Sequence, residues 1–251
     1  MTTGIAQPPL DKYQLRRAVA LLRYEAIKAL SLRSTWMAIG ALSAVLLIAG
    51  VDGLHAALRS TTRESVDPVY DVTDLVVAQY AAAALGVLAI TGEYATGAIR
   101  STCVAAPRRV QAFVAKAAVV AFLSFATGST YAVLDLNVIR PALGRHAATV
   151  PPVTLARAAV GVGLYLALIA VLAVGVGAAL RYSAGAFAIL ALVLFLADQV
   201  ISYRYLPVAG TDLIRTVHRA GASPWAGLGV LVAWTATSLT AGAIAVLGRE
   251  L

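Results

Sequence analysis

Six long apolar runs constrain this chain more than any other feature. A helix needs on the order of 20 mostly apolar residues to cross about 30 Å of hydrocarbon. The runs are Trp36–Val51, Leu75–Gly92, Phe113–Val138, Leu155–Leu180, Gly185–Ser202 and Pro224–Leu247. The first is the shortest, and we expect it to extend by tilting or through the apolar turn Leu54–Leu58. The sequence therefore predicts an all-α polytopic membrane protein with six transmembrane helices.

Composition supports a membrane protein and bounds its organisation. Of the 251 residues 60% are apolar and only 13% are charged, and the mean hydropathy is +0.83, far from the balance of a soluble domain. We expect one transmembrane domain over 1–251, with a polar and basic head at 1–35 and the bundle at 36–247. The length of this head argues against a cleavable signal peptide. The single cysteine, Cys103, cannot form an internal disulfide.

The basic residues are distributed unevenly between the two sides of the predicted membrane. Twelve of the 20 Lys and Arg residues fall in the head, in the segment between spans two and three, in the turn after span four and in the tail, against eight on the other side. This bias predicts that both termini are cytoplasmic. It also explains the net charge of +8 without a nucleic-acid partner.

The head stretch "LRRAVALLRYEAIKALSLRS" is typical of an amphipathic helix. Apolar residues recur on one side at helical spacing: Leu15, Val19, Leu22, Ala26 and Ala29. Such a helix is expected to lie at the cytoplasmic interface before turning into span one. A plain surface anchor that obeys the positive-inside rule is an equally good interpretation.

The segment "GEYATGAIRSTCVAAPRR", residues 92–109, links spans two and three. If span two continues as a helix, Glu93, Gly97, Arg100 and Val104 fall on one face, and Pro107 ends the helix. We expect a short helix below the bilayer, suited to receive a push from another protein. The arginines of the segment can also be simple topology anchors.

Glu93 is costly near hydrocarbon unless it reaches water or pairs with a cation. The head offers three candidate cations in the same layer: Arg23, Lys28 and Arg33. An ion pair at the membrane boundary and a direct contact with another protein are therefore both open for Glu93.

Here the sequence resembles the permeases of type 2 ABC exporters. The resemblance lies in "RYEAIKALSLRSTW" before span one and in "GEYATGAIRSTCVAAPRRVQAFVAK" between spans two and three. By resemblance, a coupling helix that docks on a cytoplasmic ATP-binding subunit contains Glu93, Tyr94, Thr96, Gly97, Arg100, Pro107, Arg108 and Arg109, with Lys116 leading into span three. The head becomes a connecting helix with Arg23, Glu25, Lys28 and Arg33.

The resemblance implies a dimer of permeases, most simply a homodimer, in a bacterial inner membrane, with two copies of the ATP-binding subunit. ATP and magnesium would belong to that subunit, because this chain has no G-x-x-x-x-G-K-[ST] phosphate loop. We accordingly expect a transporter component that is not itself an enzyme and has no catalytic residues. The transported substrate is not readable from the sequence.

Two other classes of function remain as alternatives. A six-span membrane enzyme needs a nucleophile and base or metal ligands that converge. The histidines, His55, His146 and His218, lie in separate predicted loops without ligand spacing, so we expect no metal site. A non-transporting membrane scaffold or immunity-type protein would have the same composition and would lack an ATPase partner.

Several polar residues and glycines in or near the predicted spans are expected to have structural roles. Asp135 and Asp198 lie toward the outer ends of spans three and five, and we favour contact with interfacial water for both. Glycines in span four, Gly161, Gly163, Gly175 and Gly177, are expected to allow close helix packing. After span five, Thr211 and Asp212 are expected to cap a short interfacial or partly re-entrant helix.

Overall fold

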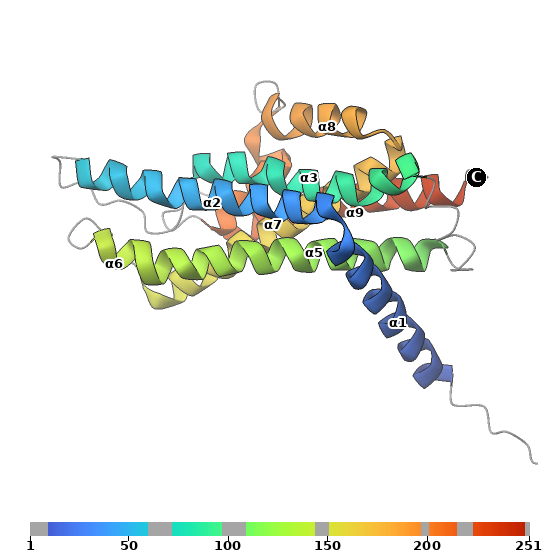
Figure 1. The fold of residues 1–251 in the computed structure, drawn as a ribbon. Helices are drawn as coiled ribbons and strands as arrows, with labels where there is room; N and C mark the ends of the chain where they lie inside the picture. Colours follow the sequence, from blue (N-terminus) through green and yellow to red (C-terminus); the bar gives the residue numbers. More distant parts are fainter. Residues whose placement is uncertain are drawn as a thin grey trace, which may run out of the picture.

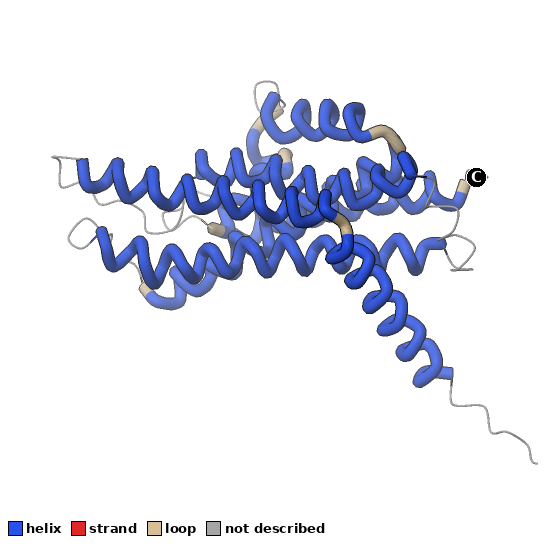
Figure 2. The backbone as a smooth tube through the Cα atoms, in the orientation of Figure 1, coloured by secondary structure: helices blue, strands red, loops and turns tan. Residues whose placement is uncertain are grey.

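The computed structural model describes residues 10–59, 72–96, 109–143, 151–196, 201–214 and 223–248, and these residues are almost entirely helical (Figures 1 and 2). The long helices are α1 (Leu10–Ser31), α2 (Arg33–Arg59), α3 (Val72–Thr96), α5 (Arg109–Leu134), α7 (Pro152–Leu180) and α9 (Pro224–Leu247). The shorter ones are α6 (Arg140–Leu143), α8 (Ser183–Ala191), the π-helices η1 (Asp135–Ile139) and η3 (Leu192–Leu196), and the 3-10 helices η5 (Tyr203–Tyr205) and η6 (Pro207–Leu213).

Five helical stretches are long and apolar enough to cross a membrane. They are Arg33–His55, Leu75–Tyr94, Val110–Ala142, Pro152–Leu180 and Trp225–Leu247, and they confirm five of the six predicted spans as membrane-length helices. The expected extension of span one is also confirmed, because α2 continues without a break to Arg59. The protein is thus a membrane-embedded helical bundle.

The predicted fifth span is only partly described. An apolar helical stretch, Ser183–Phe195, begins where that span was expected, and it is shorter than the other five. It comprises α8 and most of the π-helix η3, whose last described residue is Leu196. A sixth membrane crossing therefore stays a prediction.

Helix α7 is the centre of the bundle. Of its most apolar window, 78% of the residues are buried, against 28% for α2 and 22% for α9. It packs along α3, α5 and α9, and these are the most extensive helix pairings in the described chain. In Figure 1, α1 leaves the side of the bundle obliquely, near the end that also holds the start of α5 and the C-terminal end of α9. We call this the α1 end.

Small residues let the neighbouring helices approach α7. A side chain at Gly163 would collide with the Ser129 hydroxyl and the Phe125 carbonyl of α5, and one at Gly175 with the backbone of α9 at Ser238. On α3, a side chain at Gly86 would meet the Ala170 carbonyl. Lipid tails are as apolar as leucine, so close van der Waals packing of this kind is the main attraction between membrane helices. The predicted packing role of the span-four glycines is confirmed.

Candidate functional site

Four charged side chains meet at the α1 end, and we call them the ion network: Glu25 and Lys28 of α1, Glu93 of α3 and Lys116 of α5. Lys116 Nζ lies 2.7 Å from Glu25 Oε2 and also contacts Glu93 Oε1. Lys28 Nζ lies 2.7 Å from the same Glu93 oxygen. The network therefore joins three helices that are far apart in the sequence.

The local sequence explains how these side chains meet. Glu25 and Lys28 are three residues apart and so share one side of α1, the side that packs on α5. Glu93 lies in the last turn of α3, and Lys116 lies two turns into α5. Because α3 ends and α5 begins at the α1 end, both side chains reach the same layer.

The charges of the ion network are shielded from water and balance one another. The exposed fractions are 3% for the Glu25 side chain, 6% for Glu93 and 9% for Lys116, whereas Lys28 keeps 20%. Two carboxylates face two ammonium groups, so the formal charges cancel. A buried ion is tolerable when each charge has a partner, and truncating one partner leaves an uncompensated charge. Lys116 is the least replaceable member, since it contacts both carboxylates.

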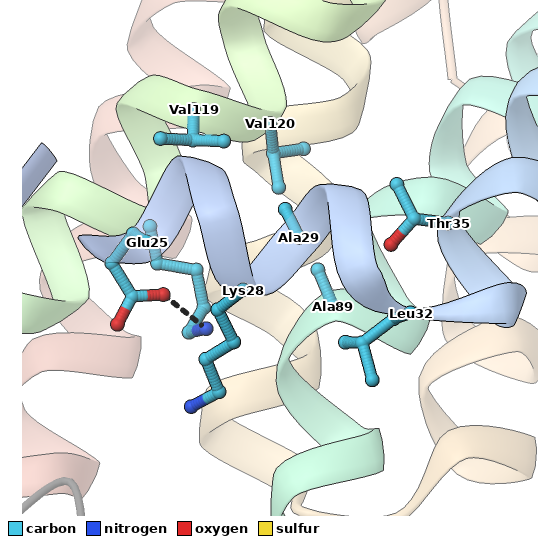
Figure 3. A pocket seen from close by; sticks show the side chains of 9 residues that line it. Glu25, Lys28, Ala29, Leu32, Thr35, Ala89, Val119 and Val120 are labelled. Carbon is cyan, nitrogen blue, oxygen red and sulfur yellow. Dashed lines mark hydrogen bonds and ion pairs between the residues drawn. The ribbon is translucent and has the colours of Figure 1, made fainter. Parts of the chain in front are cut away.

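A small pocket lies beside the ion network, between α1, α3 and α5 (Figure 3). Its volume is about 20 Å³, and it is lined by Glu25, Lys28 and Lys116 together with Thr35 and apolar residues. The dashed line in Figure 3 marks the ion pair of Glu25. Most of its lining is apolar, and the charged groups of the ion network form only one side of it.

A second contact fixes the end of α3. The Arg181 guanidinium, at the C-terminal end of α7, stacks 5.1 Å from the centre of the Tyr94 ring and donates a hydrogen bond to the Ala245 carbonyl of α9. Arg181 has a positive φ of 59°, a left-handed conformation that usually follows the end of a helix. Glu93 and Tyr94 thus connect the last turn of α3 with α1, α5 and α7.

Some of the predicted site residues lie in the described helices, and others lie outside the described ranges. It confirms that Glu93 pairs with a cation of the head, and that cation is Lys28. Helix α3 continues past Gly92 to Thr96, and α5 begins at Arg109, as expected. The rest of the predicted coupling helix, Gly97 to Arg108 with Arg100 and Pro107, lies outside the described residues. Arg23 and Arg33 are exposed at their places on α1 and α2.

Sequence reasoning missed one functional connection. Lys116 was placed only by resemblance, as a residue leading into span three, and it proves to bind both acids of the ion network. A lysine one or two turns inside an apolar run is itself a signal, because an intramembrane charge needs a partner. The sequence does not say which of several acids provides it.

A different polar cluster lies in the segment after the predicted fifth span. The Tyr203 hydroxyl is 2.7 Å from the Thr211 hydroxyl and 3.2 Å from a carboxylate oxygen of Asp212. All residues of η6 are buried, and Gly210 lies against Tyr165, halfway along α7. Irregular backbone at membrane depth is tolerated when protein covers it, and the burial of η6 is compatible with the partly re-entrant alternative. The depth of the segment in the membrane stays a prediction.

Thr211 and Asp212 lie inside the 3-10 turn η6, which begins earlier, at Pro207, and the Thr211 hydroxyl donates back to the Val208 carbonyl. The helix predicted after them continues into residues outside the described ranges, so their capping role stays a prediction. The prediction for Asp135 is wrong. Asp135 does not extend into interfacial water. Its residue is 5% exposed, and its carboxylate lies beside Gly50 in the seam between α2 and α5. Asp198 lies outside the described residues.

Among the residues described in the structure, no group of three or more His, Cys, Asp or Glu could hold a metal ion. His55 is exposed near the end of α2, while His146, His218 and Cys103 lie outside the described ranges. No protein-family model matches the chain, and no curated protein is similar enough to match it. Arguments about function therefore depend on the residues and their geometry.

Proposed function

We propose that the chain is the transmembrane permease subunit of an ATP-driven exporter, powered by a separate ATP-binding subunit. The observation that supports this most is the ion network, which joins α1, the end of α3 and the start of α5 at one end of an apolar bundle. Residues 97–108 connect the two helices that Glu93 and Lys116 anchor. A force applied to residues 97–108 would therefore be transmitted to α1, α3 and α5 together.

The energetic argument is mechanical. A segment that transmits force must be joined to the bundle by contacts that resist bending. Buried, fully paired charges resist displacement, because separating them leaves a charge without compensation, at a cost of about 3–5 kcal/mol. Paired charges are also directional, so they fix the position of the joint in addition to the close packing of the helices. The ion network provides the stiff kind of joint at the base of the predicted coupling segment.

The remaining parts of the proposal follow from the sequence. Both termini are in the cytoplasm, as the distribution of basic residues favours, and the resemblance to type 2 ABC permeases implies a bacterial inner membrane. The α8 stretch continues into a sixth span. Two permeases form a dimer around a central pathway, and two ATP-binding subunits dock on residues 93–109. Closure of those subunits would shift the pathway between its states, provided that they bind the two states with different affinity.

Affinity purification tests the proposal directly. The tagged full chain, extracted in mild detergent, should bring with it a P-loop protein that hydrolyses ATP. Arg100→Glu should reduce the amount of that protein, because it reverses a charge in the middle of the docking segment. Arg204→Glu is the matched control: it reverses an exposed arginine of η5, outside the docking segment, and should retain the partner.

Two outcomes would overturn the proposal. One is a purified chain that brings no P-loop protein from its native membrane, which is the behaviour of the scaffold alternative. The other is equal loss of the partner in both charge-reversal variants, since the docking segment would then have no special role. Wild-type abundance of both variants in the membrane shows that insertion is intact.

A further inference from the structure

Helix α1 has more surface than the ion network uses. One side of it, with Glu25 and Ala29, packs on the bundle. A second side is apolar and uncovered: Val19, Leu22 and Leu30 have exposed fractions of 57%, 40% and 44%. At helical spacing these three residues lie on one stripe, roughly a quarter of a turn from Glu25. We call them the apolar stripe.

Basic side chains border the apolar stripe. Arg16 and Arg23 are seven residues apart, both are exposed, and both lie on the edge of the stripe away from Glu25. Glu25, one of the two acids in α1, faces the other way and is neutralised by Lys116. The exposed part of the helix therefore offers apolar and positive surface together.

The joint between α1 and α2 places this surface at the membrane boundary. Only Leu32 separates the two helices, and α2 begins the first membrane-length stretch at Arg33. The Trp36 indole donates a 2.7 Å hydrogen bond to the Leu30 carbonyl across the joint, and exposed tryptophan is typical of the interfacial layer. In Figure 1, the N-terminal half of α1 extends away from the other helices.

We propose that the outer surface of α1 binds anionic phospholipids, with the apolar stripe in the acyl-chain boundary and Arg16 and Arg23 on the headgroup phosphates. Amphipathic helices bind membranes in this way, and anionic headgroups add attraction for each nearby base. A helix that only obeyed the positive-inside rule would need the arginines and no apolar stripe. The inference requires a membrane-embedded chain and does not depend on the proposed transport function.

The test uses amide hydrogen exchange of the purified full chain in two kinds of lipid nanodisc. One kind contains phosphatidylcholine alone, and the other contains phosphatidylcholine mixed with phosphatidylglycerol. We expect slower exchange over residues 16–31 in the anionic discs. Each basic residue near an anionic membrane surface increases the affinity for it by about five-fold. Removing two arginines should therefore reduce the added protection from exchange by up to about 25-fold. The variant Arg16→Gln/Arg23→Gln makes that change without touching the ion network.

Arg59→Gln/Arg204→Gln is the matched control, because it removes two exposed arginines from α2 and η5. It should keep the protection by anionic lipid, and high salt should weaken that protection in the wild type. Equal exchange of wild-type α1 in both discs would overturn the inference. Loss of protection in Arg59→Gln/Arg204→Gln would also overturn the inference, because binding of anionic lipid would then depend on the net charge of the protein and not on α1. Protection that requires an added protein would assign the stripe to a protein partner instead.

Discussion

Removing the charge of Lys116 gives the sharpest test of the ion network. Glu25 and Glu93 both contact Lys116 Nζ, so their contacting oxygens lie no more than about 5 Å apart. In Lys116→Met the apolar stem remains and the positive charge is lost. Two carboxylates then face each other with only Lys28, which is bound to Glu93, for compensation.

The magnitude follows from two independent estimates. Like charges 5 Å apart repel by about 3 kcal/mol at an effective dielectric constant of about 20. Truncating one partner of a buried ion pair costs about 3–5 kcal/mol. We therefore expect Lys116→Met to lower the free energy of unfolding by about 3–5 kcal/mol. Lys28→Met should cost no more than about 1 kcal/mol, since Lys28 is more exposed and Glu93 keeps Lys116.

The assay is unfolding of the full chain by SDS titration in mild detergent, followed by tryptophan fluorescence. The double variant Glu25→Gln/Lys116→Met restores a neutral network, because only Glu93 and Lys28 stay charged. It should recover about 1–3 kcal/mol relative to Lys116→Met. The reasoning is refuted if Lys116→Met costs no more than Lys28→Met, or if Glu25→Gln deepens the loss when added to it.

Three further predictions concern the bundle around the network. Gly86→Ala should lower the free energy of unfolding by about 1–3 kcal/mol, because its Cβ would meet a backbone carbonyl of α7. Gly40→Ala has open space around the new Cβ and should raise the free energy of unfolding by about 0.5–1 kcal/mol. Equal effects of the two variants in the same SDS titration would contradict the close packing at Gly86. Tyr165→Phe should lower the free energy of unfolding by about 1–2 kcal/mol, because it removes a buried 2.6 Å hydrogen bond to Gln79. Adding Gln79→Leu should recover part of this loss. Purely additive losses in the double variant would refute the pairing. Arg181→Gly should be more stable than Arg181→Ala by about 1 kcal/mol, because glycine adopts the positive φ without strain; thermal unfolding that ranks the two in reverse order would exclude this explanation.

The approximate positions of five spans were predictable because a membrane crossing needs a minimum length of apolar helix. The last span was expected at Pro224–Leu247, and α9 has these bounds. The same rule does not settle the fifth span, where the described helix is short and ends in a π-helix. Apolar composition fixes which residues avoid water, and it does not fix whether a helix crosses, bends or re-enters.

The ion network was predictable in kind and only partly in its members. Glu93 near hydrocarbon needs a cation, and the sequence indicated a lysine or arginine of the head. The choice of Lys28 depends on the rotation of α1 about its axis, which brings Glu25 to Lys116 across 91 residues of sequence. That rotation depends on how α1 packs on α5, and no local sequence pattern predicts it.

The segment that contains η6 shows a similar limit. Its apolar stretch "LPVAG" between polar residues is compatible with a surface turn or a buried one. Burial requires a close approach at Gly227 of α9, where the absence of a side chain leaves room for the Ala209 carbonyl. Gly161 of α7 and Gly210 of the segment itself are also in close contact there, so the burial depends on glycines far apart in the sequence.

The two ends of α1 have opposite physical character, and this links the ion network to the lipid surface. Toward α2 the helix is held by buried charges, whose contacts are short and directional. Toward its N-terminus it offers Val19, Leu22 and the arginines Arg16 and Arg23, whose proposed attraction to a bilayer is spread over many lipids. A helix fixed at one end and resting on a fluid surface at the other can pivot about the fixed end. Because the ion network joins α1 to α3 and α5, movement of either helix would displace the end of α1 that carries Glu25 and Lys28.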